Sequence, residues 1–205
     1  MNSDDYKGSK VKETAIKYSQ KKQGTYTIED YYNMPEDQRI ELIDGVIYDM
    51  ASPSIEHQII SGHIYNKLSN HIFTNKGNCK QFISPIAVKL SEDNNTMVEP
   101  DVIVVCNKDY ITSNCINGAP DFILEVTSKS SKIRDTIVKL NKYKVSGVKE
   151  YWIIDYQENL VHIYNFARDT YVKKTFQESY IITVLNPPCT IDFKEIHNEI
   201  IDTYK

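Results

Sequence analysis

Alternation and helical spacing of apolar residues predict a mixed α/β structure that begins with a β-hairpin. Residues 40–50 alternate apolar and polar side chains on both sides of Asp44-Gly45, a dipeptide typical of tight hairpin turns. Apolar residues then recur every three or four positions over 54–74, which predicts a helix capped at Ser52-Pro53. The capping box Thr27-Ile-Glu-Asp30 predicts a short helix before the hairpin.

Beyond residue 78 the pattern predicts a series of strands with one helix among them. Apolar runs bounded by turn residues indicate the strands, and apolar positions at helical spacing indicate the helix, which ends at Gly147. The strands are expected at 79–90, 98–106, 121–128, 149–155, 160–166 and 171–176, and the helix at 131–146. Parallel neighbours need a helical crossover, so this order predicts a central mixed β-sheet flanked by helices on both faces.

The chain length of 205 residues suits one domain with a short extension. Residues 1–24 are polar and lysine-rich, so we expect a flexible N-terminal arm there and a single domain over 25–205. The part after about residue 167 could close the sheet, cover one of its edges or join an interface. The N-terminus lacks the apolar core of a secretory signal, and no apolar run could span a membrane, so we expect a cytoplasmic protein.

The net charge of −4 argues against a protein that coats nucleic acid through general electrostatic attraction. Basic residues gather between Lys129 and Lys149, where they form either a nucleic-acid-binding surface or a solvated helix face. The four cysteines lack the spacing of a metal site. Cys79 and Cys106 lie in apolar, strand-like stretches, so free buried thiols are expected rather than a structural disulfide or a zinc site.

Two carboxylates in separate apolar runs are candidate metal ligands. Asp101 enters one run, and Glu125 interrupts the next. Asp121 competes with Asp101, but in an extended strand it lies about 13 Å from Glu125, too far to share one ion. Sheet pairing can instead bring Asp101 beside Glu125. A hard cation such as Mg²⁺ prefers carboxylate oxygens and can promote phosphodiester cleavage. The alternative is that Glu125 is a surface carboxylate near the strand end.

The helix that follows Glu125 places Asp135, Lys139 and Tyr143 on one face, because they recur at a spacing of four. A lysine on this face could reach a phosphate held near Asp101 and Glu125. The alternative is an ordinary ion pair between Asp135 and Lys139 on the helix surface, which would stabilise the helix only slightly.

In this order, the residues resemble the Uma-two family, a branch of the PD-(D/E)XK superfamily of restriction-endonuclease-like proteins. The resemblance covers roughly residues 25–165. It rests on Glu41-Leu-Ile-Asp-Gly45, His57, Glu99-Pro-Asp101, Pro120-Asp-Phe-Ile-Leu-Glu-Val-Thr-Ser128, the set Asp135, Lys139 and Tyr143, and Gly147-Val-Lys-Glu-Tyr-Trp-Ile-Ile-Asp155. The resemblance implies a restriction endonuclease-like core and a metal-dependent nuclease site.

The resemblance also implies roles for individual residues. Asp101 and Glu125 would be metal ligands. Lys139 would be the motif's lysine displaced onto the helix, since Thr127 occupies its usual position. Glu41 matches the family's hairpin glutamate and would be a further acidic ligand, the alternative being a strand-edge carboxylate.

Four further positions would support the site: His57, Thr127, Asp135 and Tyr143. Asp135 and Tyr143 would position the lysine. His57 would contact a phosphate or transfer a proton, although a lone histidine early in a helix more often packs or caps. Lys129 departs from the family's usual proline, which leaves the charged positions intact.

The sequence therefore predicts a Mg²⁺- or Mn²⁺-dependent DNA endonuclease. A homodimer is expected, because two related sites cut both strands of a duplex most easily. Two alternatives remain open. One is a nuclease-like fold that serves as a nucleic-acid-binding or regulatory module without cleavage, which Thr127 and the acidic net charge favour. The other is a partner-binding domain in which these charges form only surface ion pairs.

Overall fold

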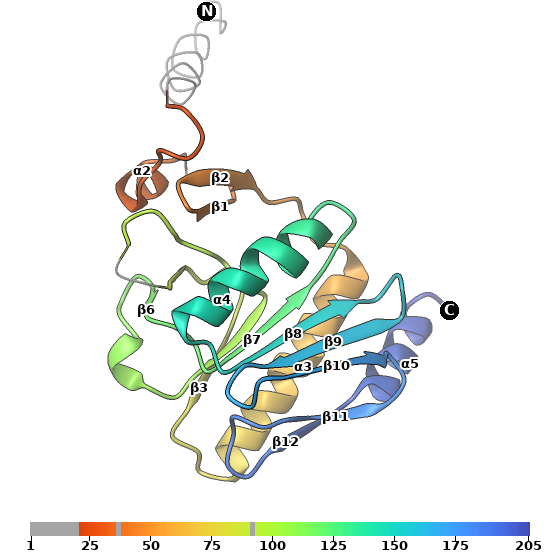
Figure 1. Ribbon diagram of the computed structural model, residues 1–205. Coiled ribbons are helices and arrows are strands. Elements are labelled where there is room, and N and C mark those ends of the chain that lie inside the picture. Colours follow the sequence, from red (N-terminus) through yellow and green to blue (C-terminus); the bar gives the residue numbers. More distant parts are fainter. Residues whose placement is uncertain (1–20, 36–37, 91–92) are drawn as a thin grey trace, which may run out of the picture.

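The computed structural model describes residues 21–35, 38–90 and 93–205 (Figure 1). Most of the predicted arm, residues 1–20, lies outside this part of the chain. Its last residues, 21–24, contact the hairpin: Ile47 N–H donates to Gln23 Oε1 at 2.8 Å, and Gly24 N–H donates to Gly45 O at 2.8 Å. Within the described residues, no helix is both long and apolar enough to cross a membrane.

A six-stranded mixed sheet forms the centre of the molecule, as the sequence predicts. Its strand order is β10-β9-β8-β7-β5-β3. The strands are β3 (Lys80–Ile83), β5 (Val102–Val105), β7 (Phe122–Val126), β8 (Glu150–Asp155), β9 (Leu160–Asn165) and β10 (Thr170–Thr175). Only β7 and β8 run parallel, and the helical segment between them provides the crossover that this pairing requires.

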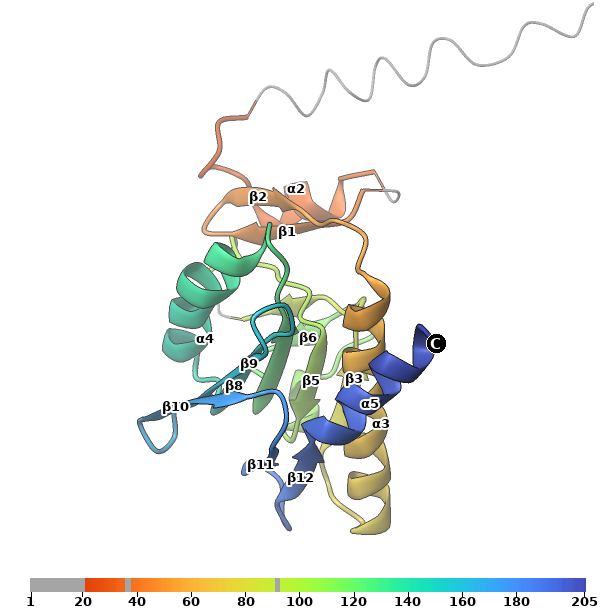
Figure 2. The same cartoon turned by 90° about the vertical axis from the view of Figure 1, so that its right-hand side faces the viewer.

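Helices cover both faces of the sheet (Figure 2). On one face lie α3 (Ile55–Thr74) and α5 (Phe193–Thr203), and on the other the helical segment formed by η2 (Arg134–Lys139) and α4 (Leu140–Ser146). Strand alternation sends Phe122 and Leu124 into the core under α3, whereas Ile123 packs with Tyr143 under α4.

The C-terminal part of the chain covers the face of the sheet that carries α3. Strands β11 (Ser179–Ile182) and β12 (Cys189–Asp192) pair with each other, and they pack with α5 into the core under α3. Of the part after about residue 167, β10 forms an edge strand of the sheet, whereas β11, β12 and α5 complete the core over one face instead of covering an edge. Trp152, in the middle of β8, is fully buried against Phe193 of α5.

A separate small unit precedes the sheet, at the top of Figure 1. It contains α2 (Ile28–Tyr32), whose predicted capping box is confirmed, and the predicted hairpin of β1 (Ile40–Ile43) and β2 (Val46–Asp49). The remaining short elements are β4 (Val88–Lys89), its parallel partner β6 (Ile116–Asn117), and the 3-10 helix η1 (Lys108–Tyr110).

Several predicted boundaries differ from the observed ones for local reasons. The cap of α3 is Ser54, not Ser52, because Ser54 Oγ accepts the His57 N–H at 3.2 Å. The run 79–90 is not one strand, since β3 ends before the cis Ser84-Pro85 bond. The helix predicted at 131–146 begins as a π-helix, a wider form that is common at functional sites.

The prediction of free thiols at Cys79 and Cys106 was wrong, since the structure joins them in a disulfide. Antiparallel pairing of β3 and β5 sets Lys80 opposite Val105 and so brings the two cysteines face to face. Their Cα atoms lie 3.9 Å apart. The sequence pattern identified both strands but not that they are neighbours. Cys115 and Cys189 are free thiols.

The hairpin turn provides a test of the fold. Gly45 has φ +74°, and an added Cβ would lie 2.7 Å from the carbonyl carbon of Gly24. Gly45→Ala should therefore lower the free energy of unfolding by about 1–3 kcal/mol. Gly62, inside α3, has open space around it, so Gly62→Ala should raise that free energy by about 0.5–1 kcal/mol. Urea denaturation of both variants measures the contrast, and equal shifts would contradict it.

Candidate active site

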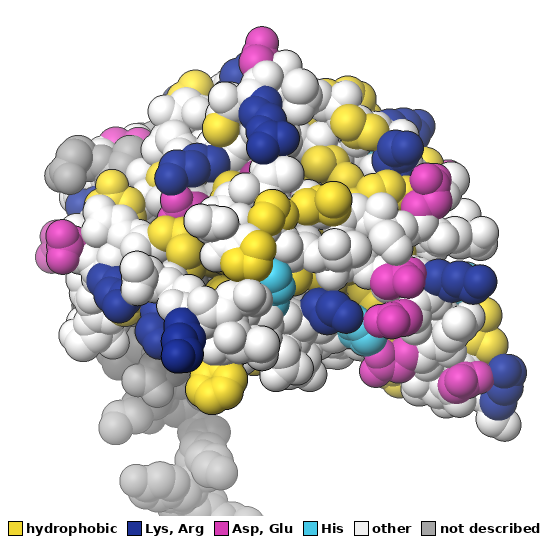
Figure 3. Space-filling view, turned by 90° about the horizontal axis from the view of Figure 1, so that it is seen from below, with side chains coloured by type: hydrophobic (Ala, Val, Ile, Leu, Met, Phe, Trp, Pro, Cys, Tyr) yellow, Lys and Arg dark blue, Asp and Glu magenta, His cyan; other side chains and the backbone are white. Residues whose placement is uncertain are grey.

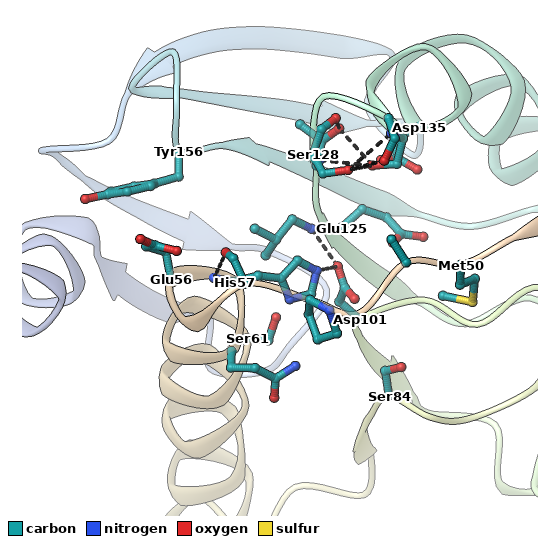
Figure 4. A pocket seen from close by; sticks show the side chains of 18 of the residues that line it. Met50, Glu56, His57, Ser61, Ser84, Asp101, Glu125, Ser128, Asp135 and Tyr156 are labelled. Atoms are coloured by element: carbon teal, nitrogen blue, oxygen red, sulfur yellow. Dashed lines mark hydrogen bonds and ion pairs between the residues drawn. The ribbon is translucent and has the colours of Figure 1, made fainter. Parts of the chain in front are cut away.

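A cavity of about 950 Å³ opens where the linker from the hairpin, the first turns of α3 and the end of β7 meet. Asp101, Glu125, Asp135 and Lys139 all line it, together with His57 (Figure 4). Its volume lies within the range usual for ligand sites. Most residues that the sequence proposed as a site therefore share one cavity, although they come from positions far apart in the chain. Glu41 and Tyr143 do not line it, but they contact Lys139 and Glu125.

Glu125 is the buried centre of this group. Strand alternation turns it away from the α3 core toward the helical segment after β7. One carboxylate oxygen, Oε1, accepts hydrogen bonds from Lys139 Nζ and from Tyr143 OH, both at 2.8 Å. Burial raises the pKa of Glu125 well above its ordinary value, and the nearby Lys139 only partly counteracts this effect. The alternative of an exposed carboxylate near the strand end is therefore wrong.

Lys139 joins three carboxylates. Its Nζ lies 2.7 Å from Glu41 Oε1, 2.8 Å from Glu125 Oε1 and 3.7 Å from Asp135 Oδ1. Burial alone would lower the pKa of the Lys139 ammonium, but attraction to these carboxylates outweighs it and the pKa is raised. Lys139 therefore stays protonated. A surface ion pair with Asp135 does not describe it, because its side chain is only 3% exposed and the Asp135 contact is the longest of the three.

Asp101 immediately precedes β5 and is fixed to the neighbouring strand. Its Oδ2 accepts the Val126 N–H at 2.7 Å, next to Glu125 along β7. The same oxygen lies 3.1 Å from His57 Nε2. The competing Asp121 lies at the other end of β7, where its carboxylate binds Cys106 N–H and Lys149. Sheet pairing thus brings Asp101, and not Asp121, beside Glu125.

Glu41 approaches from the hairpin and is fully buried. Its Oε1 accepts the Glu99 N–H at 3.0 Å as well as contacting Lys139, and its Oε2 lies 3.5 Å from Arg134 Nε. Glu41 is thus not a strand-edge carboxylate. Arg134, whose guanidinium also lies 5.3 Å from the centre of the Tyr48 ring, was missed by the sequence argument. Its position next to Asp135 was the available signal.

The supporting residues have mixed surroundings. Asp135 is buried, and burial raises its pKa, while Lys139 and the hydroxyls of Ser131 and Thr127 act in the opposite direction. Thr127, at the position where the simplest motif has lysine, therefore contacts the helix that carries Lys139. The His57 Nε2 atom contacts the Asp101 carboxylate. The other ring nitrogen of His57, Nδ1, has no hydrogen-bond partner among the described residues.

The basic cluster between Lys129 and Lys149 consists mainly of ion pairs. Six of its seven members have an acidic partner: Lys132 with Asp155, Arg134 with Glu41, Lys139 with Glu125, Lys142 with Asp44, Lys144 with Asp169 and Lys149 with Asp121. On the face away from the hairpin, basic side chains are interspersed with acidic and apolar ones rather than gathered in one continuous patch (Figure 3). Neither observation favours a broad electrostatic surface for nucleic acid.

The charges at the site fit a divalent cation. Glu41, Asp101, Glu125 and Asp135 carry four carboxylates, whereas Lys139 and Arg134 supply two cations. Among the described residues, no three His, Cys, Asp or Glu side chains form a ready metal-binding group. Mg²⁺ does not require one, because it usually keeps several waters and takes one or two protein carboxylates. Asp101 and Glu125, which line the cavity, suit that role.

Comparison with known proteins agrees with this reading of the chain. The Uma2 family model, described as "Putative restriction endonuclease", matches residues 28–188. A similar solved structure is that of "a putative nuclease belonging to DUF820 from Anabaena variabilis ATCC 29413", with a TM-score of 0.62 and 17% sequence identity. The match covers 83% of this chain and 96% of that one, and it shows a shared fold. None of the curated proteins matches.

The family match spans most of the chain and includes every residue that lines the cavity except His197. It confirms the resemblance drawn from the sequence motifs, and it supports a nuclease function. The chain belongs to the Uma2 family of restriction endonuclease-like proteins.

Proposed function

We propose that this protein is a Mg²⁺- or Mn²⁺-dependent DNA endonuclease of the PD-(D/E)XK type. The observation that carries the proposal is the Glu125 carboxylate, which is buried at the cavity, bound by Lys139 and Tyr143, and next to Asp101 through Val126. Burying such a carboxylate is unfavourable unless a cation or a proton compensates it. A divalent ion in the cavity would supply that compensation.

Each residue has a role that follows from its contacts. Asp101 and Glu125 would hold the ion, with Glu41 nearby through Lys139. The bound ion would lower the pKa of a coordinated water and offset charge on the scissile phosphate. Because Lys139 stays protonated, it cannot accept a proton from the attacking water. It would instead hold the carboxylates in place and stabilise the negative charge that develops on the phosphate oxygens.

Tyr143 and Asp135 would act by positioning Lys139 and Glu125. The Tyr143 hydroxyl donates to the same Glu125 oxygen that Lys139 binds, so it fixes the rotamer of that carboxylate. Burial raises the pKa of Tyr143 well above its ordinary value, and the Glu125 charge adds to this effect, so the phenol keeps its proton and remains a donor. His57 would orient Asp101 through Nε2.

Plasmid nicking with Mg²⁺ or Mn²⁺ tests the proposal. The wild-type protein should nick plasmid DNA, and Asp101→Ala should show no nicking above background because one metal ligand is lost. Asp121→Ala is the matched control, since Asp121 lies at the far end of β7 and should retain activity. Equal activity in wild type and Asp101→Ala would rule out this site. No activity in a folded wild type would favour the alternative of a nucleic-acid-binding module without cleavage.

Other parts of the proposal follow from the expected reaction. Residues 25–205 would act as one domain, and the enzyme would cut duplexes as a homodimer. The cytoplasmic placement expected from the sequence is also part of the proposal.

A further inference from the structure

One wall of the cavity consists of an aromatic ring, an imidazole and uncharged amides. It comprises Tyr156, Gln157, Asn159, Gln177 and His197, and we call it the amide wall. The β8–β9 turn, the β10–β11 turn and α5 supply these residues. The wall is continuous: the Tyr156 ring lies 6.4 Å from that of His197, and the Phe176 N–H donates to Asn159 O at 3.1 Å.

Two arginines line the opposite side of the cavity, each paired with a glutamate. Arg39 donates to Ser84 Oγ at 3.2 Å and lies 3.4 Å from Glu99 Oε2, and Arg134 lies 3.5 Å from Glu41 Oε2. Figure 4 shows Tyr156 on one side of Asp101 and Glu125, and Ser84 on the other. The acidic centre therefore lies between a side that carries two arginines and a wall that has no arginine or lysine.

Polar groups on the amide wall have unused hydrogen-bonding capacity. Among the described residues, no intramolecular hydrogen bond engages the side-chain amides or the Tyr156 hydroxyl, and the three amide side chains are exposed. The His197 Nδ1 and Ser61 Oγ atoms, both at the cavity, are buried and have no hydrogen-bond partner in the described part of the chain. Buried polar atoms without partners are unfavourable, so the wall favours an occupant that supplies donors and acceptors.

The charge beside the wall argues against a phosphate as this occupant. Glu56, in the first turn of α3, lies near Tyr156 and its carboxylate accepts from Tyr204 OH at 2.6 Å. A nucleobase meets all the requirements: it has a flat face for an aromatic ring and an edge of donors and acceptors that amide side chains can bind.

We propose that the amide wall binds one unpaired nucleobase next to the scissile phosphate, with Tyr156 as its stacking platform. This inference rests on the proposed nuclease function and specifies its substrate class. A base inside a duplex has both faces stacked and its Watson–Crick edge occupied, so only an unpaired or extruded base can use the wall. The enzyme should therefore prefer single-stranded or locally unpaired nucleic acid.

Measurements of oligonucleotide binding test the proposed base site at the amide wall without relying on cleavage. Fluorescence anisotropy with Ca²⁺ would compare a labelled single-stranded 12-mer of DNA, the same strand with one central abasic site, an RNA 12-mer and a blunt DNA duplex. Tyr156→Ala should weaken binding of the intact strand about tenfold, because one base loses its stacking partner. Tyr156→Phe should retain the affinity, and binding of the duplex should not change.

Two variants guard against a general loss of structure. Gln177→Ala changes an exposed side chain of the wall and should weaken single-strand binding while thermal unfolding stays as in wild type. Tyr171→Ala removes a tyrosine of β10 that stacks on Tyr164 outside the cavity, and it should bind like wild type. If Tyr156→Ala binds single strands as tightly as wild type, or weakens single strands and duplex alike, the proposal is wrong.

Cleavage assays separate this inference from the nuclease proposal. If wild type cuts nothing but single-strand binding depends on Tyr156, the wall is a base-binding site in a protein without cleavage. If wild type cuts single strands and duplex at equal rates, and Tyr156→Ala changes neither rate, the enzyme is a nuclease and the base site is refuted. Stronger dependence on Tyr156 for RNA than for DNA would support the same site and assign it to RNA.

Discussion

Replacing Lys139 with methionine should lower the free energy of unfolding by about 3–5 kcal/mol, the usual cost of leaving buried charges without their partner. The Lys139 ammonium lies within 2.8 Å of both Glu41 and Glu125, and all three side chains are almost fully buried. Methionine is close to lysine in length, so the cavity left behind is small and the loss is mainly electrostatic. Urea denaturation at neutral pH measures the change.

Lys144→Met is the matched control. Lys144 lies on α4, one and a half turns beyond Lys139, with 59% of its side chain exposed and a partner, Asp169, that is 90% exposed. Its loss should change stability by less than about 0.5 kcal/mol. A double variant that also carries Glu125→Gln should recover part of the stability lost in Lys139→Met, since one unpaired charge is removed. Similar losses in the two single variants would show that the buried cluster adds nothing beyond a surface ion pair.

The residues of the cluster could be predicted where periodicity decides the outcome. Alternation along β7 fixes which face carries Glu125, and the spacing of four places Lys139 and Tyr143 on one side of the following helix. Both patterns are local in the chain, and the structure agrees with both, since Lys139 and Tyr143 bind the same Glu125 oxygen. The choice of Asp101 over Asp121 needed only strand geometry, because two residues four apart on one strand cannot share an ion.

Contacts between elements could not be predicted from the sequence pattern. Glu41 reaches Lys139 only because the hairpin packs over the helix that follows β7, and Arg134 meets Glu41 and Tyr48 for the same reason. The disulfide depends on β3 and β5 being neighbours, which no local signal states. The amide wall likewise joins two turns and α5, which lie far apart along the chain. Periodicity describes an element, whereas these features require the packing of several.

The helical segment after β7 shows both what the periodicity predicts and what it misses. Its extent was predicted closely, but its first part is a π-helix, which the apolar spacing did not reveal. The same segment carries Arg134, Asp135 and Lys139, so the irregular turn lies where three charged side chains enter a buried site. Ile133 and Ile137, which the apolar spacing would bury, are 73% and 63% exposed. The polar face of this segment, rather than its apolar stripe, faces the cavity.

Mg²⁺ should stabilise the wild-type protein more at high pH than at low pH, and Glu125→Gln should abolish both this effect and DNA cleavage. Burial raises the pKa of Glu125 in the folded protein well above its ordinary value of about 4.5. When the pH is below this ordinary pKa, the Glu125 carboxyl is protonated in both the folded and the unfolded state. It then makes no pH-dependent contribution to the free energy of unfolding. As pH rises further, the unfolded chain loses this proton first, so the folded state binds more protons and the free energy of unfolding falls. Metal binding replaces the proton, and its benefit grows over the same range.

Thermal unfolding at about pH 6 and about pH 8, with and without Mg²⁺, measures this linkage. A concentration of about one hundred times Kd should add about 2.7 kcal/mol to the free energy of unfolding at the higher pH, and less at the lower pH because protons compete. Glu125→Gln has no carboxylate to titrate, so its stability without metal should depend less on pH and respond little to Mg²⁺. Glu158→Gln changes an exposed carboxylate in the β8–β9 turn and should behave like wild type. Stabilisation of Glu125→Gln by Mg²⁺ equal to that of wild type would place the ion elsewhere, because the buried carboxylate would then have no part in holding it.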